Sequence, residues 1–293
     1  MKKIVLVHLC VLLSYADVLG STKSAADGAQ PLQGDTYAFI VSGISKDRQD
    51  SVAKAAAVGD LRKYLLEEAA VRPQRLTVLV PPRQAADPSG KQNRDNTPTA
   101  ENIKTAVDAL ASVIKPADRF IFYYIGQANA VGSSRRSEPE PGGKLRFNLL
   151  GPDITHEQLA HWLAGVKVNT QLVVLDCPCA ALAAKAMAGR GRFVVCAAEA
   201  TQAYGTTFSS HFVPALAQSQ SDANSDGRVS LLEAFAAAAK QIDQWYRQRQ
   251  LLPTETPSLE DDGDGIPSER PWRYKLDARD GRNASQFFVA AGR

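Results

Sequence analysis

The sequence predicts an α/β fold in which helices flank a parallel sheet. Short, almost unbroken apolar runs recur along the chain, as is typical of strands that are buried on both faces of a parallel sheet. Between these runs stand segments whose apolar residues recur at helical spacing, and such alternation is typical of parallel sheets covered by helices. The 293 residues and the apolar content of 44% are sufficient for one large core.

The first half of the chain supplies three expected strands and two expected helices. The strands are apolar runs that end in turn residues or prolines, and they occupy residues 35–43, 75–80 and 118–126. The first helix is expected at 51–70, because Val58, Leu61 and Leu65 fall on one face at helical spacing. Proline is favoured in the first turn of a helix, so Thr97-Pro98 predicts the start of the second.

The second half continues the alternation after a polar loop expected at 127–143. Thr155, followed by Gln158 three residues later, has the capping-box pattern that begins a helix. Further strands are expected at 172–175 and 192–198, and further helices at 181–188, 208–218 and 230–248. We therefore expect one main domain over 35–250.

The C-terminal residues 251–293 differ in composition from the main domain. They are rich in proline, glycine, aspartate and arginine, and only 287–289 has the apolar character of a strand. We expect an irregular C-terminal extension over this range.

The N-terminus has the pattern of a secretory signal peptide. Lys2 and Lys3 give it a positive start, a short apolar stretch follows, and small residues come next. The apolar stretch is shorter than the roughly 20 residues that span a bilayer, which favours a cleaved signal over an uncleaved membrane anchor. We expect a signal peptide at 1–20, a disordered lead-in at 21–34, and a secreted or periplasmic protein with no stable membrane span.

Charge and cysteine content exclude two classes of protein. The formal net charge of +3 is small and evenly spread, so the sequence argues against a nucleic-acid partner. Removal of the signal peptide leaves Cys177, Cys179 and Cys196, and this odd, sparse set is not a disulfide framework. We expect buried thiols.

The strongest motif is a twelve-residue loop at 222–233 that matches the calcium loop of an EF-hand. Gly227 stands where the loop turns sharply, and Val229 is the apolar residue that docks the loop. The alternative is a solvated acidic turn that only caps the next helix. Because the motif occurs singly, it favours a structural calcium ion over a sensor. The expected Ca²⁺ ligands are Asp222, Asn224, Asp226, the backbone carbonyl of Arg228, Ser230 (often through water) and Glu233.

A second acidic run follows at 260–265. Glu260, Asp262 and Asp264 fit the first, third and fifth positions of the same motif, with Gly265 at the sixth. No glutamate follows six residues after Gly265, where the last ligand would stand. The run is thus either a weak second ion site or only a glycine-rich acidic turn.

Several blocks in order resemble the caspase-like and legumain-like cysteine peptidases, in particular their exported bacterial relatives. The resemblance covers roughly residues 36–266 and implies a three-layer α/β sandwich with a parallel sheet. The blocks are YAFIVSG, DRFIFYYIG, FNLLGPDIT, QLVVLD, DANSDGRVSLLEAF and TETPSLEDDGDG.

The resemblance also implies a catalytic dyad, and this chain departs from it. In that family the third strand ends in a His-Gly pair that holds the base, and the fourth ends in an acid, a small residue and the nucleophilic cysteine. Here Gln127 stands at the histidine position. After Asp176, Cys177 takes the small-residue position and Pro178 the position of the nucleophile. Glutamine cannot take up a proton near neutral pH, and proline carries no nucleophile.

The sequence therefore predicts an exported, calcium-binding pseudopeptidase that acts as a binding or scaffold module for protein or peptide ligands. The alternative is an active cysteine endopeptidase with a rearranged site that uses Cys179 or Cys177. Such a site needs a base, and the histidines outside the signal peptide are His156, His161 and His211. A third reading is a module that serves only through its calcium-stabilised shape.

Overall fold

The computed structural model describes residues 34–82, 96–131, 143–277 and 279–290. The expected signal peptide at 1–20 and all but the last residue of the expected lead-in at 21–34 lie outside the described residues. Within the described part of the chain, no helix has both the length and the apolar character needed to cross a bilayer.

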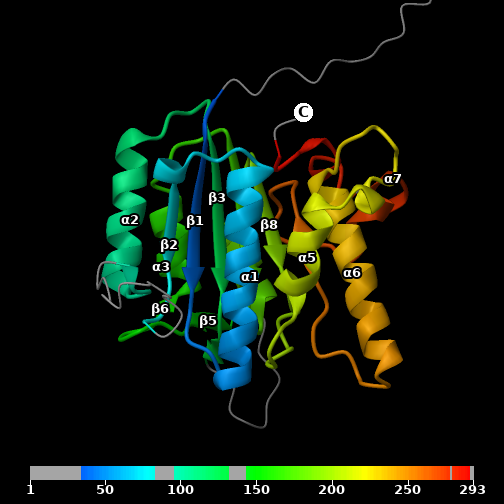
Figure 1. Cartoon of the computed structure of the whole chain (residues 1–293), viewed down its shortest axis with the longest axis horizontal. Coiled ribbons are helices and arrows are strands. Elements are labelled where there is room, and N and C mark those ends of the chain that lie inside the picture. The colour runs from blue at the N-terminus through cyan, green and yellow to red at the C-terminus, as the bar shows by residue number, and fades with distance from the viewer. Residues whose placement is uncertain (1–33, 83–95, 132–142, 278, 291–293) are drawn as a thin grey trace, which may run out of the picture. The chain divides into compact units, whose positions relative to one another are not determined.

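A six-stranded sheet forms the middle layer, with the strand order β2-β1-β3-β7-β8-β9 (Figure 1). Neighbouring strands run parallel, except that β9 runs antiparallel to β8 at one edge. The strands are β1 (Thr36–Ser42), β2 (Leu76–Leu79), β3 (Arg119–Ile125), β7 (Thr170–Asp176), β8 (Arg192–Cys196) and β9 (Ser258–Glu260).

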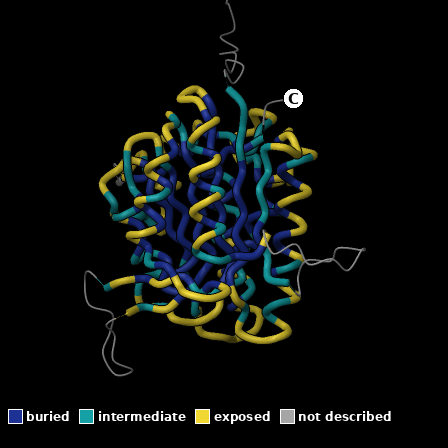
Figure 2. The backbone as a smooth tube through the Cα atoms, turned by 90° about the vertical axis from the view of Figure 1, so that its left-hand side faces the viewer, coloured by how far each residue is buried: buried dark blue, intermediate teal, exposed yellow. Residues whose placement is uncertain are grey.

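Helices cover both faces of this sheet, which gives three layers (Figure 1). One face packs against α1 (Arg48–Glu67), α5 (Phe208–Ala217) and α6 (Leu231–Gln248). The other packs against α2 (Ala100–Val113), α3 (His156–Leu163) and the short α4 (Ala184–Met187). Figure 2 shows the buried sheet backbone between helical turns that are exposed on their outer sides. The predicted class, an α/β fold with a parallel sheet flanked by helices, is confirmed.

Successive side chains of a strand point to opposite faces of a sheet, so each central strand contributes to the cores on both sides. In β1, Ala38 and Ile40 belong to the core beneath α1, whereas Phe39 and Val41 belong to the core beneath α2. The central strands β3 and β7 alternate between the two cores in the same way. The central strands β1, β3 and β7 therefore appear in the sequence as nearly continuous apolar runs.

Side-chain caps determine where the helices begin. The predicted capping box at α3 is present, with Gln158 N donating to Thr155 Oγ1 at 3.2 Å and Thr155 N donating to Gln158 Oε1 at 2.9 Å. The second helix begins slightly later than Thr97-Pro98, because Thr99 is its N-cap. These bonds satisfy N–H groups that would otherwise have no partner at a helix start.

A second, smaller sheet replaces part of the expected polar loop at 127–143. It is antiparallel, and its strands are β4 (Ala128–Val131), β5 (Lys144–Phe147) and β6 (Ile154–Thr155). The expected helix at 181–188 is divided into a 3-10 turn and α4. The remaining elements are α7 (Tyr274–Asp277) and 3-10 turns at Pro73–Arg75, Ala180–Ala183, Ser219–Ser221, Pro271–Arg273 and Ala284–Gln286.

The sheet continues beyond residue 250, where the sequence predicted an irregular extension to begin. β9 completes the sheet, with Glu260 opposite Val194 of β8. The strand expected at 287–289 is not formed. Phe287 instead stacks on Phe193 with ring centroids 4.6 Å apart, so its apolar side chain serves core packing rather than strand pairing.

Candidate functional site

The carboxyl ends of β3 and β7 lie side by side. Ile125 pairs with Asp176, and Gly126 N donates to the Asp176 carbonyl at 3.1 Å. Gln127 and Pro178, the two positions at which the resemblance implies a dyad, therefore follow adjacent strand ends. We call this rim of the sheet the carboxyl edge.

Gln127 joins the loops of the carboxyl edge to one another. Its N–H donates to the Ile44 carbonyl at 3.1 Å, and its own carbonyl accepts Asn148 N at 3.0 Å and the Tyr124 hydroxyl at 2.7 Å. Its side-chain Nε2 donates to Asp50 Oδ2 at 3.3 Å. Gln127 therefore acts here as a hydrogen-bonding connector.

Asp50 extends this network to a buried lysine. The Asp50 Oδ2 atom also accepts Lys54 Nζ at 2.6 Å and Lys46 N at 2.7 Å. The Lys54 residue is only 6% exposed, so its charge needs this acid as a partner. The position at which the resemblance implies a histidine thus holds an amide that contacts an ion pair.

Asp176 holds the start of α5. Its Oδ1 accepts Thr206 Oγ1 at 2.5 Å, and its Oδ2 accepts Ser209 N at 2.9 Å and the Ser209 hydroxyl. The Tyr123 hydroxyl lies 2.9 Å from Ser209 Oγ and is the donor there, because the serine proton is directed to Asp176. Both oxygens of this buried carboxylate are therefore satisfied by the chain itself.

Glu255 is a second buried carboxylate at the same helix start. Its two oxygens accept Thr207 N at 3.0 and 2.8 Å, and Oε1 also accepts Thr207 Oγ1 at 2.6 Å. Burial, with a further contribution from the charge of Asp176, raises the pKa of Glu255 to about 7. Sequence reasoning missed Glu255, because it lies far along the chain from the helix that it caps.

The three cysteines outside the expected signal peptide are free and buried, as predicted. Burial raises the pKa of Cys177 well above its usual value, and the charge of Asp176 adds to the shift. Burial also raises the pKa of Cys179, and it raises that of Cys196 to about 12. At neutral pH these sulfurs are protonated and lack the thiolate character of a nucleophile.

The histidines are engaged elsewhere in the fold. His156 Nδ1 accepts Leu145 N at 3.0 Å, and His211 Nδ1 lies 3.4 Å from Gln241 Oε1 between α5 and α6. His161 is exposed on α3. Within the described residues, the hydrogen bonds of His156 and His211 go to these groups and not to the thiols of the rival site.

The loop at 222–233 is closed by Glu233. The Glu233 Oε1 atom accepts Ala223 N at 3.1 Å and Asn224 N at 3.2 Å, while Oε2 accepts Ser230 N at 2.9 Å and Ser230 Oγ at 2.7 Å. The last carboxylate of the motif thus reaches from the first turn of α6 back to the first residues of the loop. In an EF-hand loop this position provides the bidentate ligand.

The other expected ligands bond to N–H groups of the same loop. Asp222 Oδ2 accepts Gly227 N at 2.9 Å, Asn224 Oδ1 accepts Asp226 N at 2.8 Å, and Asp226 Oδ1 accepts Arg228 N at 2.9 Å. Gly227 has a φ of +83°, a left-handed conformation that glycine adopts without strain. The side-chain oxygens of Asp222, Asn224, Asp226 and Glu233 thus all bond to backbone N–H groups of this one loop, and oxygen ligands of this kind are what Ca²⁺ requires.

This loop lies on the opposite rim of the sheet, which we call the amino edge (Figure 1). Leu231 N donates to the Phe287 carbonyl at 2.8 Å, and the Arg228 guanidinium lies 3.6 Å from the ring centroid of Phe288. The Phe288 carbonyl in turn accepts Arg119, the first residue of β3, at 2.7 Å. The candidate calcium loop and the residues Gln127 and Pro178 are therefore at opposite ends of the strands.

The second acidic run at 260–265 forms a turn after β9. Asp262 Oδ1 accepts Asp264 N at 3.0 Å, and Asp264 Oδ1 accepts Ile266 N at 2.6 Å. Among the described residues, one trio of acidic side chains has oxygens that all lie within 4.8 Å of one another: Glu260, Asp262 and Asp280. The carboxylates of 222–233 are not gathered this closely. Sequence reasoning missed Asp280, because only the fold brings it to the turn.

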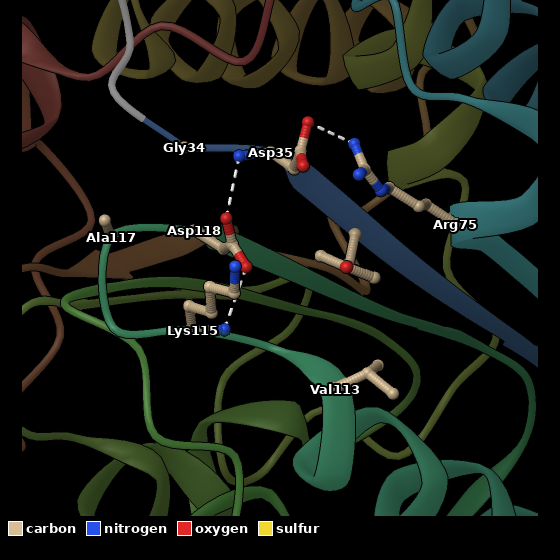
Figure 3. A pocket seen from close by; sticks show the side chains of 8 residues that line it. Gly34, Asp35, Arg75, Val113, Lys115, Ala117 and Asp118 are labelled. Carbon is tan, nitrogen blue, oxygen red and sulfur yellow. Dashed lines mark hydrogen bonds and ion pairs between the residues drawn. The ribbon is translucent and has the colours of Figure 1, made fainter.

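Two pockets lie away from both candidate sites. One of about 610 Å³ lies at the amino edge, where Asp35 pairs with Arg75 and where Asp118 accepts Asp35 N and Lys115 N, each at 2.8 Å (Figure 3). The other, of about 530 Å³, is lined by α6 and by neighbouring residues of 253–257 and 269–272. Neither pocket is lined by Gln127, Pro178 or a cysteine.

Comparisons with known proteins identify a similar solved structure but no family. No protein-family model matches the chain, and no curated protein matches it. Among solved structures, protein GSU0716 from Geobacter sulfurreducens is similar, with a TM-score of 0.49 and 13% sequence identity. The match covers 80% of this chain and 97% of that chain.

Proposed function

We propose that this chain is an exported, calcium-binding, non-catalytic relative of the caspase-like and legumain-like cysteine peptidases that acts as a binding or scaffold module. The position of the Glu233 carboxylate carries the calcium part of the proposal. The first turn of α6 directs this carboxylate to the start of the loop, so that one ion can connect the two ends of the motif.

On calcium binding, the side-chain oxygens of the loop would exchange their backbone N–H partners for the ion, and the loop would keep its overall conformation. The oxygens of Asp222, Asn224 and Asp226 already converge on one short turn, where backbone N–H groups hold them. An ion in the turn attracts these oxygens with its full positive charge, and this attraction is stronger than that of the partial charges on N–H groups. A single loop of this kind favours a structural ion that fixes the connection between α5 and α6.

The absence of catalysis is proposed from the chemistry of the carboxyl edge. Gln127 donates to Asp50, and Asp176 is fully occupied by the start of α5. The thiols of Cys177 and Cys179 are buried, with raised pKa values. Export is proposed from the N-terminal sequence. The binding or scaffold role is proposed because the side chains at the carboxyl edge are held in structural hydrogen bonds or buried as protonated thiols.

Calcium is expected to raise the melting temperature of the mature protein relative to the same protein in EGTA. At a calcium concentration ten times the dissociation constant, one site stabilises the native state by about 1.4 kcal/mol. Glu233→Gln is expected to reduce this response, since glutamine retains the capping box but lacks the charge for the ion. Thermal unfolding followed by circular dichroism measures both effects.

The control for this experiment is Asp243→Asn. It makes the same change of charge on the same helix, where Asp243 forms an exposed pair with Arg247. This variant should respond to calcium like the wild type. Equal responses of the Glu233 and Asp243 variants would show that the loop does not bind the ion.

The native thiols are expected to resist both iodoacetamide and a peptidyl electrophile at pH 7, because they are buried and protonated. In denaturant, iodoacetamide should modify Cys177, Cys179 and Cys196 together, as counted by mass spectrometry. Native labelling of Cys179 by the peptidyl electrophile, abolished in Cys179→Ala, would overturn this expectation and favour the rearranged peptidase.

A further inference from the structure

Three carboxylates from two distant segments converge beside the edge strand β9. Glu260 ends the strand, Asp262 lies in the turn that follows, and Asp280 comes from the C-terminal segment. Their oxygens lie within 4.8 Å of one another. Glu260 is 0% exposed and Asp280 is 2% exposed, whereas Asp262 is exposed, so the group is a buried pair with one side open to solvent.

The residue between the first two acids fixes this arrangement. Asp261 Oδ1 accepts Gly281 N at 2.9 Å, its Oδ2 accepts Ala284 N at 2.6 Å, and its carbonyl accepts Asn283 Nδ2 at 2.6 Å. Its own N–H donates to Asp280 Oδ1 at 2.8 Å. Asp261 thus binds the C-terminal segment to the turn and holds Asp280 beside the other two acids.

Glu260 presents an oxygen for which the described residues supply no hydrogen-bond partner. Its Oε1 accepts Gly263 N at 2.5 Å, but Oε2 is buried and has no hydrogen-bond partner among the described residues. A buried carboxylate oxygen without a partner is costly, and a bound cation is one of the few groups that can satisfy it. The lack of a partner for this oxygen is an observation separate from the number of acids in the turn, and it also points to a bound ligand.

The number and chemistry of the ligands suit one class of ion. Ca²⁺ is bound by several protein oxygens, whereas Mg²⁺ keeps several waters and is usually bound through one or two carboxylates. Three carboxylates whose oxygens lie within 4.8 Å of one another therefore match Ca²⁺ better than Mg²⁺.

We propose that Glu260, Asp262 and Asp280 bind a calcium-sized divalent cation that fastens the C-terminal segment to strand β9. Asp280 supplies from a distant segment the carboxylate that the acidic run lacks after Gly265. Asp264, the fifth residue of the run, takes no part, since it lies outside the trio and bonds to Ile266 N. The site is separate from the loop at 222–233 and does not depend on it.

Asp262→Asn tests this site, with Asp264→Asn as its matched control. Both acids are exposed, both lie in one turn, and each accepts the N–H two residues further on, which asparagine can also accept. Calorimetric titration of the mature protein with CaCl₂ is expected to give two ions per wild-type chain. Asp262→Asn should lose one ion or bind it at least about tenfold more weakly, whereas Asp264→Asn should keep both.

Glu233→Gln separates this inference from the proposed function. If Asp262→Asn loses an ion and Glu233→Gln loses none, the cation site stands and the role of the loop fails. If only Glu233→Gln loses an ion, the loop stands and the present inference is wrong. Magnesium that binds at this site as tightly as calcium would overturn the assignment of a calcium-sized ion. In EGTA, Asp262→Asn should unfold at the same denaturant concentration as wild type, which excludes misfolding as the cause.

Discussion

Replacement of Asp176 by alanine is expected to lower the free energy of unfolding by about 3 kcal/mol. The carboxylate is 3% exposed and accepts bonds from Ser209 N, the Ser209 hydroxyl and Thr206 Oγ1. Alanine leaves these donors buried without an acceptor and removes the contact between the end of β7 and the start of α5. Urea denaturation measures the loss.

Asp176→Asn provides the graded comparison. Asparagine keeps the shape and one acceptor oxygen, but its amide group would face donors, so an intermediate loss is expected. If Asp176→Ala falls within about 0.5 kcal/mol of wild type, Asp176 does not hold the helix, and its place in the fold must have another reason.

The free energy of unfolding is expected to fall as the pH rises from about 5 to 8, and Glu255 should contribute about 3 kcal/mol to this fall. Its pKa is raised from 4.5 to about 7 in the native state, so the native state binds the proton more tightly than the unfolded chain. The stabilisation is complete below the unfolded pKa and is lost as the pH rises through the native pKa. Denaturant titrations in EGTA across this range measure the slope.

Glu255→Gln isolates this contribution. The variant should show a shallower slope between pH 5 and 8, because glutamine does not titrate in this range. Burial also raises the pKa of Asp280 to about 7. Asp280 therefore adds to the pH dependence of the free energy of unfolding, and it does so equally in wild type and variant. Glu157→Gln, a change on the exposed surface of α3, should leave the slope unaltered. Equal slopes for wild type and Glu255→Gln would contradict the assignment.

The sequence predicts the interior of the sheet well because burial on both faces leaves a strong local signal. Each central strand is an apolar run, and each predicted run at 35–43, 118–126 and 192–198 contains an observed strand. β9 has no apolar run that would predict it, because it is a three-residue edge strand that is defined by its pairing with β8. Residues 287–289 mislead for the opposite reason, because an apolar segment can cover a core without forming a strand.

The candidate sites divide in the same way. The loop at 222–233 is contiguous, so its ligand set can be read from residue spacing alone. Asp280 and Glu255 belong to constellations that exist only after folding, since the first meets β9 and the second meets α5 across long stretches of chain. No local pattern distinguishes them from surface acids. Cys179 is likewise a buried thiol and not a nucleophile because of the residues around it in the fold, and the local sequence does not show them.

The hydrogen bonds of Gln127 have a consequence for where a partner could be received. Strand order reverses between β1 and β3, since β2 lies on one side of β1 and β3 on the other, and ligands of open α/β sheets enter the crevice at such a switch point. Here the crevice is crossed by three backbone bonds: Gly43 N to the Ile125 carbonyl, Ile44 N to the Asn148 carbonyl, and Gln127 N to the Ile44 carbonyl. A side chain at Gly43 would overlap the Tyr124 hydroxyl. These bonds hold the loops of the two strand ends against each other, so a partner of this edge would first meet the outer surface of the loops.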